Sequence, residues 1–183
     1  MTASADGARD RPAAVSSFAP IANRDARVLV LGSMPGARSL AADQYYAHPQ
    51  NRFWWIMGQL FDAAPEHSYA QRTRQLRAHG VALWDVLQSC VRPGSLDADI
   101  DPATVVANDF AALFARCPRI GAVLCNGGTA WQFYRRYVLP DLPQPWASLP
   151  VTKLPSTSPA HASMRPAQKL AAWRRALRPF LPG

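Results

Sequence analysis

Short apolar runs alternate with helical patterns over most of this chain. The runs are rich in Val, Leu and Ala and occupy residues 28–31, 81–86, 122–125 and 147–154. Apolar residues recur at helical spacing over residues 53–61, 68–79, 109–114, 129–137 and 166–177. Strands that alternate with helices are typical of an α/β fold. We therefore predict a single domain with a central, mostly parallel four-stranded sheet flanked by helices.

The first 22 residues differ from the rest of the chain. They are small and polar and are interrupted by Pro, a composition typical of a disordered tail. We predict such a tail for residues 1–22 and one folded domain for residues 23–183. A chain of 183 residues is long enough for a single domain with a sizeable core.

The chain is strongly basic. It has 20 Lys and Arg against 12 Asp and Glu, which gives a formal charge of +8 and an isoelectric point near 10.1. This excess favours a polyanionic partner, nucleic acid before an anionic membrane. The alternative is that a GC-rich genome has raised the Arg content without any such partner.

The cysteines and histidines do not form a metal-binding pattern. Cys90, Cys117 and Cys125 are scattered, and none belongs to a Cys-x-x-Cys pair. We therefore expect no zinc, iron–sulfur cluster or other cofactor. An odd number of cysteines, without a secretory or membrane-spanning run, is typical of a reduced cytoplasmic protein. We expect a soluble monomer.

Two segments that follow the first apolar run carry candidate chemistry. Residues 32–36 form a Gly- and Pro-containing turn, and residues 45–54 combine aromatic, amide and basic side chains. Ligands of open α/β sheets bind beyond the carboxyl ends of strands. Flat aromatic faces and the amide of Asn51 suit a planar heterocycle. The turn lacks the Gly-Lys-Ser/Thr ending of a phosphate-binding P-loop, which argues against an NTPase.

These segments resemble the uracil-DNA glycosylase superfamily. Residues 46–54 resemble the mismatch-specific uracil/thymine-DNA glycosylases, and residues 32–36 resemble their first motif. Residues 154–161 lie where the superfamily carries its second, DNA-gripping motif. Residues 84–86, 94–97 and 125–128 are most similar to the hypoxanthine-DNA (deoxyinosine) glycosylase branch. The resemblance covers roughly residues 26–178 and implies the α/β/α sandwich of that superfamily.

The resemblance assigns roles around the first motif. Most superfamily members place there a polar side chain that positions the attacking water, but this chain has Met34. The hypoxanthine branch uses an Asn that matches Asn51, so Asn51 is the predicted catalytic residue. The other interpretation of Asn51 is a cap for the helix that begins near Arg52. Tyr46 matches the aromatic side chain on which the extruded base stacks, and Ser33 and Met34 complete the predicted base pocket.

Asn126 is the second candidate amide. It follows a predicted buried strand and precedes Gly127 and Gly128. An amide has one acceptor and two donors, so it can pair with the edge of an extruded base. Asn-Gly is also a common turn dipeptide, but the resemblance places Asn126 at the pocket Asn that recognises the base. Asp85, at the end of the second apolar run, could touch the site, but a structural role is the favoured interpretation.

The second motif and the last helix supply the predicted DNA contacts. Hydroxyl groups and Pro suit a loop that grips a phosphate. By resemblance, Ser158 matches the phosphate-binding Ser, and Ala160 and His161 lie where relatives fill the gap left by the extruded nucleotide. The predicted DNA-binding residues are Ser156, Ser158, Ala160, His161, Arg174 and Arg175.

The resemblance therefore predicts a monofunctional DNA glycosylase. Such an enzyme extrudes a deaminated base from double-stranded DNA and removes it by hydrolysis, which leaves an abasic site. Hypoxanthine is the favoured base; uracil or thymine in a mismatch is the runner-up, because hypoxanthine and uracil both present a carbonyl beside an N–H. An alternative of another class is a non-catalytic DNA-lesion binding protein, since Met34 replaces the usual polar group.

Overall fold

A four-stranded parallel sheet forms the centre of the computed structural model, which describes residues 13–181. Its strands run in the order β3 (Val81–Asp85), β2 (Val28–Gly32), β6 (Val123–Asn126) and β7 (Val151–Leu154). Every residue of β2 and β3 is buried, as expected for apolar strands that are covered on both faces. The predicted four-stranded parallel sheet is confirmed.

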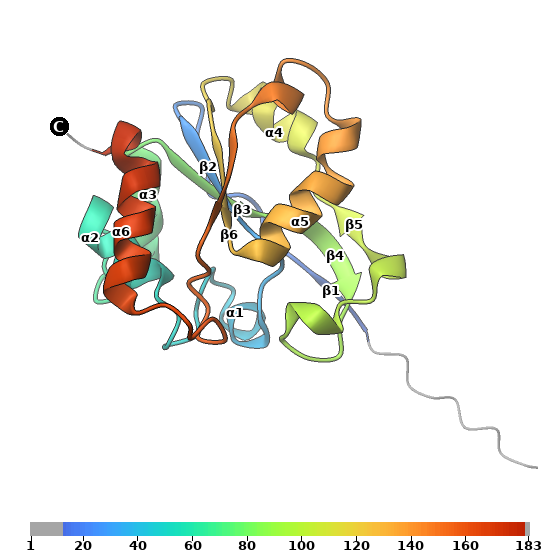
Figure 1. Cartoon of the computed structure of the whole chain (residues 1–183), viewed down its shortest axis with the longest axis horizontal. Coiled ribbons are helices and arrows are strands. Elements are labelled where there is room, and N and C mark those ends of the chain that lie inside the picture. Colours follow the sequence, from blue (N-terminus) through green and yellow to red (C-terminus); the bar gives the residue numbers. More distant parts are fainter. Residues whose placement is uncertain (1–12, 182–183) are drawn as a thin grey trace, which may run out of the picture.

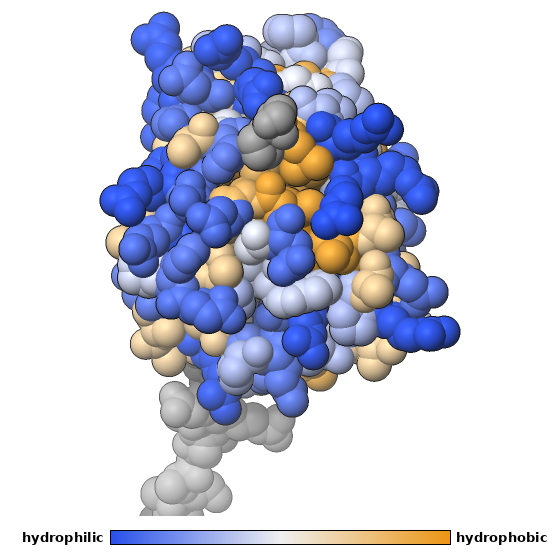
Figure 2. Space-filling model, turned by 90° about the vertical axis from the view of Figure 1, so that its left-hand side faces the viewer, coloured by the Kyte–Doolittle hydropathy of each residue, from blue (hydrophilic) through white to orange (hydrophobic). Residues whose placement is uncertain are grey.

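Helices cover both faces of this sheet (Figure 1). One side carries α2 (Phe53–Phe61), α3 (Tyr69–Ala78) and α6 (Pro166–Leu177). The other side carries α4 (Phe110–Arg116) and α5 (Gly128–Tyr137). The predicted α/β/α sandwich is therefore confirmed. Figure 2 views the face formed by α2, α3 and α6, where hydrophilic residues surround a central apolar patch.

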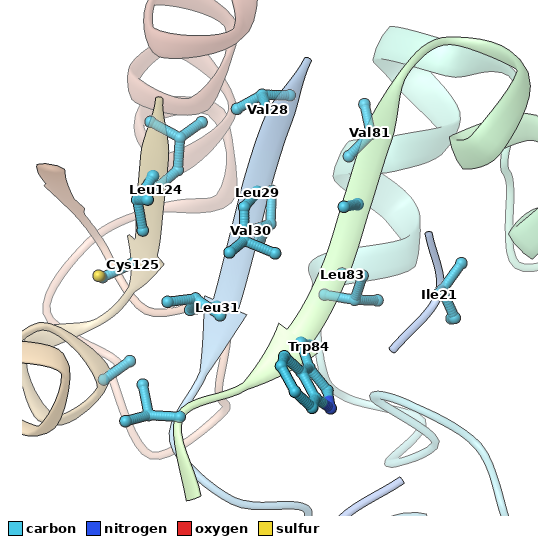
Figure 3. Close-up of a cluster of buried hydrophobic side chains, with 14 of the residues drawn as sticks. Ile21, Val28, Leu29, Val30, Leu31, Val81, Leu83, Trp84, Leu124 and Cys125 are labelled. Carbon is cyan, nitrogen blue, oxygen red and sulfur yellow. The ribbon is translucent and has the colours of Figure 1, made fainter. Parts of the chain in front are cut away.

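Apolar side chains of β3, β2 and β6 meet in one core. Figure 3 shows β6, β2 and β3 side by side with their aliphatic side chains between the helical layers. The labelled core residues include Val28, Leu29, Val30, Leu31, Val81, Leu83, Leu124 and Cys125, all at most 3% exposed. Trp84 lies at the end of β3, next to the loops that follow the strands. The core thus holds the strand ends in place.

A second, antiparallel sheet was not predicted. It contains β1 (Ala14–Ser16), β4 (Leu87–Val91) and β5 (Val106–Ala107), in the order β1-β4-β5. The prediction of a disordered tail through Ala22 is therefore wrong for residues 13–22, because β1 pairs with β4 and Ile21 pairs with Leu83. Residues 1–12 of that predicted tail lie outside the described residues.

The predicted helices agree with the structure to within a few residues, whereas the fourth strand does not. Ser68 and Gln71 form a capping box at the start of α3, and Gly80 follows its end with a φ of 72°. The run at residues 147–154 was predicted as one strand, but its first part belongs to the 3₁₀ helix Trp146–Ser148. Short elements that were not predicted are α1 (Ala37–Ala42) and the 3₁₀ helices Asp97–Asp99, Pro102–Thr104, Leu139–Asp141 and Arg178–Phe180.

The ordered segment before β2 leads to a stability prediction. Ile21 is 8% exposed, packs in the core and exchanges backbone hydrogen bonds with Leu83. I21A should lower the free energy of unfolding by about 2–5 kcal/mol, because it removes buried methyl groups and leaves a cavity. V106A, at a side chain that is 48% exposed, should change it by about 0.5 kcal/mol or less. Urea unfolding checks both; equal midpoints for I21A and the parent would contradict the described packing.

Candidate functional site

All four strands of the parallel sheet end at one edge of the molecule, at the bottom of Figure 1. Strand pairing sets Gly32 opposite Asp85 at the ends of β2 and β3, and Asn126 opposite Leu154 at the ends of β6 and β7. The loops that leave these ends gather at this edge, which we call the carboxyl edge. Open α/β sheets bind ligands at such an edge.

Two reciprocal hydrogen bonds fasten the loop after β7 to the end of β6. Asn126 Nδ2 donates to Thr157 Oγ1, and Thr157 N–H donates to Asn126 Oδ1, each at 2.9 Å. Gly127 has a φ of 98°, and a Cβ at this position would lie only 3.0 Å from Ser156 Cβ. Glycine is therefore needed for the close approach of the two segments. The half-buried Asn126 amide keeps one further donor hydrogen for a ligand.

Tyr46 lies beside these strand ends in an uncommon backbone conformation. Its φ of 54° is in the left-handed region, where a bulky residue is uncommon and often marks a functional site. One face of its ring stacks on Phe53, with 4.1 Å between ring centroids. The side chain is half-buried, but its hydroxyl oxygen is fully buried and has no hydrogen-bond partner among residues 13–181. Burial, reinforced by Asp85 and opposed by Asn126, raises the pKa of this hydroxyl.

Asn51 lies at the start of α2 and contacts the same group of residues. Its Oδ1 accepts a hydrogen bond at 2.9 Å from the N–H of Phe53, the first residue of α2, whereas the cap residue itself, Arg52, makes no side-chain cap hydrogen bond. The neighbouring Arg52 N–H donates to the Thr157 carbonyl at 3.0 Å. Asn51 therefore holds the first residue of α2 from one position before the cap, and a catalytic role for Asn51 stays a prediction. Phe53, which bonds to Asn51, also stacks on Tyr46, and Thr157, which bonds to Arg52, also pairs with Asn126. Asn51 therefore lies at the same part of the carboxyl edge as Tyr46 and Asn126.

Asp85 lies beside these residues, at the strand end where the sequence left a contact with the site open but favoured a structural role. It is 3% exposed, and its Oδ1 lies 2.3 Å from the point that a Cβ on Gly32 would occupy. The Tyr46 hydroxyl lies 3.0 Å from the same point. Burial and the nearby Asp97 carboxylate raise the pKa of Asp85 from the usual 3.8 to about 8, against the opposing effect of Arg92. The lack of a side chain at Gly32 makes room for both oxygens.

The first motif is held from the segment that follows β4. Ser33 Oγ donates to Asp97 Oδ2 at 2.6 Å, and Arg92 Nη1 lies 3.9 Å from Asp97 Oδ1. Arg92 also donates to the Pro35 carbonyl. Met34 is 6% exposed and packs in the core. Ser33 and Met34 thus have protein contacts that explain their positions, and their predicted contact with a base stays a prediction.

The hydroxyl groups of the second motif shape their own loop. Ser156 Oγ accepts from Ser158 N–H, and Ser158 Oγ accepts from Ala160 N–H, each at 3.2 Å. Ala160 is exposed, and His161 is half-buried. Side chains that accept from the loop's own amides fix its shape, so they position the loop as much as they offer groups to a phosphate.

A basic hollow of about 300 Å³ lies beside this loop. Its lining includes Arg52, Ser158, His161 and Lys169. Lys169 is 4% exposed and donates to the His161 carbonyl at 2.7 Å. Burial and the nearby Arg52 lower the pKa of Lys169, as expected where two cations share one site. Adjacent cations and loop hydroxyls suit a phosphate oxygen, and the sequence did not single out Arg52 or Lys169 for this role.

Arg174 and Arg175 are not brought to the basic hollow. Both are exposed in the last turn of α6. The hollow adjoins the other end of this helix, at Pro166. In Figure 1, the helix runs from the carboxyl edge toward the opposite side of the molecule. These two arginines can therefore contact DNA only if a duplex extends along α6.

The described part of the chain contains no group of three His, Cys, Asp or Glu that could hold a metal ion. The three cysteines are buried and unpaired. No helix within residues 13–181 is both long and apolar enough to cross a membrane.

The family model of the uracil DNA glycosylase superfamily matches residues 19–178. The chain belongs to the uracil DNA glycosylase superfamily. Within it, the chain is 32% identical to the hypoxanthine DNA glycosylase of Methanosarcina barkeri over a matched segment of 117 residues. This segment covers 63% of this chain and 73% of that protein. The chain is also 29% identical over 117 residues to the hypoxanthine DNA glycosylase of Methanosarcina acetivorans, and this match again covers 63% of this chain and 73% of the relative.

A solved structure supports the same assignment. The solution NMR structure of a candidate uracil DNA glycosylase from Methanosarcina acetivorans superposes with a TM-score of 0.70 at 27% identity, covering 89% of this chain and 98% of that one. Membership of the superfamily makes this protein a DNA glycosylase, a hydrolase of N-glycosidic bonds whose substrate is DNA. The carboxyl edge is then the candidate site for the base, and the basic hollow is the candidate site for a backbone phosphate.

The basic hollow leads to a prediction about salt dependence. Each neutralised phosphate contributes about −0.9 to the slope of log K against log salt for duplex DNA. R52A should therefore weaken binding and reduce the magnitude of this slope by about 0.9. Fluorescence anisotropy with a labelled duplex, measured across a salt series, provides the slope.

R119A is the matched control for this prediction. Arg119 is exposed and pairs with Asp25 in the loops that precede β6 and β2, at the opposite edge of the sheet. It changes the net charge equally and should leave the slope unchanged. Equal slopes for R52A and R119A would show that the hollow does not hold a phosphate. The double variant R174A/R175A tests the second proposed contact in the same assay.

Proposed function

We propose that this protein is a monofunctional DNA glycosylase that removes hypoxanthine from deoxyinosine in double-stranded DNA. The observation that carries the proposal is the convergence of Tyr46, Asn126 and Asn51 at the carboxyl edge of a superfamily member whose curated relatives are named hypoxanthine DNA glycosylases. Each of the three residues supplies one requirement of base removal: a stacking face, a hydrogen-bonding amide and a position for water.

Recognition of the base begins with stacking. The Tyr46 ring is backed on one face by Phe53 and is half-buried, so its other face can receive an extruded base. Stacking of a base on an aromatic side chain stabilises binding by about 1–3 kcal/mol. The remaining donor of Asn126 meets the carbonyl oxygen of the base. Because Thr157 already fixes the Asn126 amide, this donor is oriented before DNA binds.

Hydrolysis requires a positioned water rather than a strong nucleophile. Breaking the N-glycosidic bond leaves positive charge on the sugar and negative charge on the departing base. The Asn51 Oδ1 accepts from Phe53 N–H and keeps a second lone pair that can accept from water. This arrangement orients the water toward C1′ in place of the polar side chain that Met34 replaces. Positioning of this kind accelerates a reaction without covalent chemistry.

The absence of an available amine favours monofunctional chemistry. The sequence contains Lys153 and Lys169 as its two lysines. Lys153 Nζ lies 5.3 Å from the centre of the Trp131 ring, and Lys169 donates to the His161 carbonyl. Neither is aimed at the group formed by Tyr46, Asn126 and Asn51, so we assign no Schiff-base step. The product is an abasic site.

Base release from defined duplexes tests the proposal. The purified protein is incubated with duplexes that contain one inosine, uracil or xanthine, and abasic sites are then cleaved with alkali. We expect strand breaks with inosine, and only after alkali. Breaks restricted to uracil would favour the second candidate, a uracil/thymine mismatch glycosylase, to which the candidate uracil DNA glycosylase structure also points. Binding without breaks would identify a non-catalytic lesion-binding protein.

Asn51 supplies a prediction for this assay. N51A should reduce the single-turnover rate of base release by on the order of a hundredfold, because misplacing a reacting group has effects of this size. Binding to inosine DNA should persist. Gln59, an amide side chain exposed on α2, provides the control variant Q59A, which should retain the parent rate. Parental rates for N51A would leave Asn51 with its structural contact to Phe53 alone.

Metal removal supplies a second prediction. Base release should continue at the full rate in excess chelator, because the proposed chemistry needs only hydrogen-bond donors and a positioned water. Rates are compared before and after dialysis against the chelator, with added zinc or iron as a further sample. A loss of activity that zinc or iron restores would contradict the proposed mechanism.

A further inference from the structure

The Asp85 carboxyl group reaches the candidate base pocket with hydrogen-bonding capacity that the protein does not use. Its Oδ2 is fully buried and has no hydrogen-bond partner among residues 13–181. Its Oδ1 occupies the space beside Gly32, next to the Tyr46 hydroxyl, which also lacks a partner. The Asp85 backbone carbonyl accepts from Asn108 Nδ2 at 2.9 Å, which fixes the strand end that carries the carboxyl. Leaving two adjacent buried groups unpaired is unfavourable unless a ligand completes them.

The surroundings of Asp85 disfavour its ionised form. The titratable and charged groups around it are Asp97, Arg92, Tyr45, Tyr46 and Tyr69. Arg92 directs its hydrogen bonds at the carbonyls of Gly94 and Pro35, and its recorded ion pair is with Asp97. Within residues 13–181, no ion pair or side-chain hydrogen bond compensates the Asp85 carboxylate. Burial first, and Asp97 second, raise the pKa of Asp85 to about 8.

We propose that Asp85 contacts the extruded base and, as a neutral carboxyl group, donates a hydrogen bond to its carbonyl oxygen. This inference rests on the proposed function, because it assigns a role within the same base pocket. Gly32 is the position that allows the contact, since any side chain there would occupy the space of the carboxyl oxygen. The Tyr46 hydroxyl completes this side of the pocket.

The chemistry of the leaving base explains why a neutral acid is needed. When the bond between C1′ and the base nitrogen breaks, its electron pair passes to the base and is delocalised onto the carbonyl oxygen. A donor aimed at this oxygen stabilises the transition state more than the ground state. A neutral carboxyl supplies such a donor together with an acceptor for the adjacent N–H of the base. An ionised carboxylate would place a negative charge against the charge that develops.

The pH dependence of base release tests this role in two variants. For the wild type, the single-turnover rate on inosine DNA should fall as the pH rises through about 8, because Asp85 then loses its proton. D85N keeps a donor and an acceptor but cannot ionise; its rate should be several-fold below the parent at pH 7 and should not show this fall. D85A removes both groups and should lose on the order of a hundredfold. Ionisation of the base itself would persist in D85N, so the comparison isolates Asp85.

Two results would overturn the inference. If Asp85 acts as an ionised base or as an electrostatic partner of the sugar cation, the wild-type rate rises through pH 8 and D85N is inactive. If Asp85 is only structural, D85N retains the same alkaline fall as the parent. Failure of the proposed function looks different, because the wild type then releases no base from inosine DNA at any pH.

Thermal unfolding tests the protonation of Asp85 without any substrate. The folded state keeps this proton up to about pH 8, whereas the unfolded chain loses it near the usual pKa of 3.8. Stability linked to Asp85 is therefore lost as the pH rises between these values. The Tm of D85N minus that of the wild type should increase from pH 4 to pH 8 and then level off. A difference that is constant over this range would show that Asp85 is ionised at neutral pH and would overturn the inference.

Discussion

Parallel pairing of the four central strands is the constraint on which the candidate site depends. The strands β2, β3 and β6 are short and apolar up to their last residues, so the polar groups of the sheet's interior lie at the strand ends. Pairing in the order β3-β2-β6-β7 brings four different segments to one edge, and the register sets Gly32 beside Asp85 and Asn126 beside Leu154. A shift of one residue in the β2–β3 register would separate Asp85 from the only residue type that leaves room for its carboxyl group.

Several residues of the site stabilise the fold as well as offering groups to a ligand. Asn126 fastens the loop after β7 through Thr157, and Asn51 holds the first residue of α2 through Phe53 N–H. These contacts explain how a loop-based site is held rigid: each amide is oriented by the backbone of a neighbouring segment. They also mean that alanine substitutions alter loop position as well as recognition, so conservative variants and neighbouring control residues carry more information.

The sequence predicted the parallel sheet and most helices, because their apolar periodicity and capping residues are local signals. It missed β1 and β5, whose two or three residues form strands only through pairing with β4. Motif resemblance singled out Asn51, Tyr46 and Asn126, which the structure places at the same edge of the sheet, and their roles stay predictions. The sequence did not single out Lys169 or Arg52 and favoured a structural role for Asp85. Their proposed roles rest on burial and on contacts across more than 50 residues of chain, as between Asp85 and Gly32 or between Lys169 and Arg52.

The central claim is that the carboxyl edge is the pocket for an extruded hypoxanthine. A crystal structure of the N51A variant bound to an inosine-containing duplex would test it most directly. The account predicts that the inosine leaves the helix, that its base stacks on the face of Tyr46 opposite Phe53, and that its carbonyl oxygen lies about 3 Å from Asp85 and Asn126. An inosine that stays within the duplex, or a base bound away from Tyr46, would contradict this account.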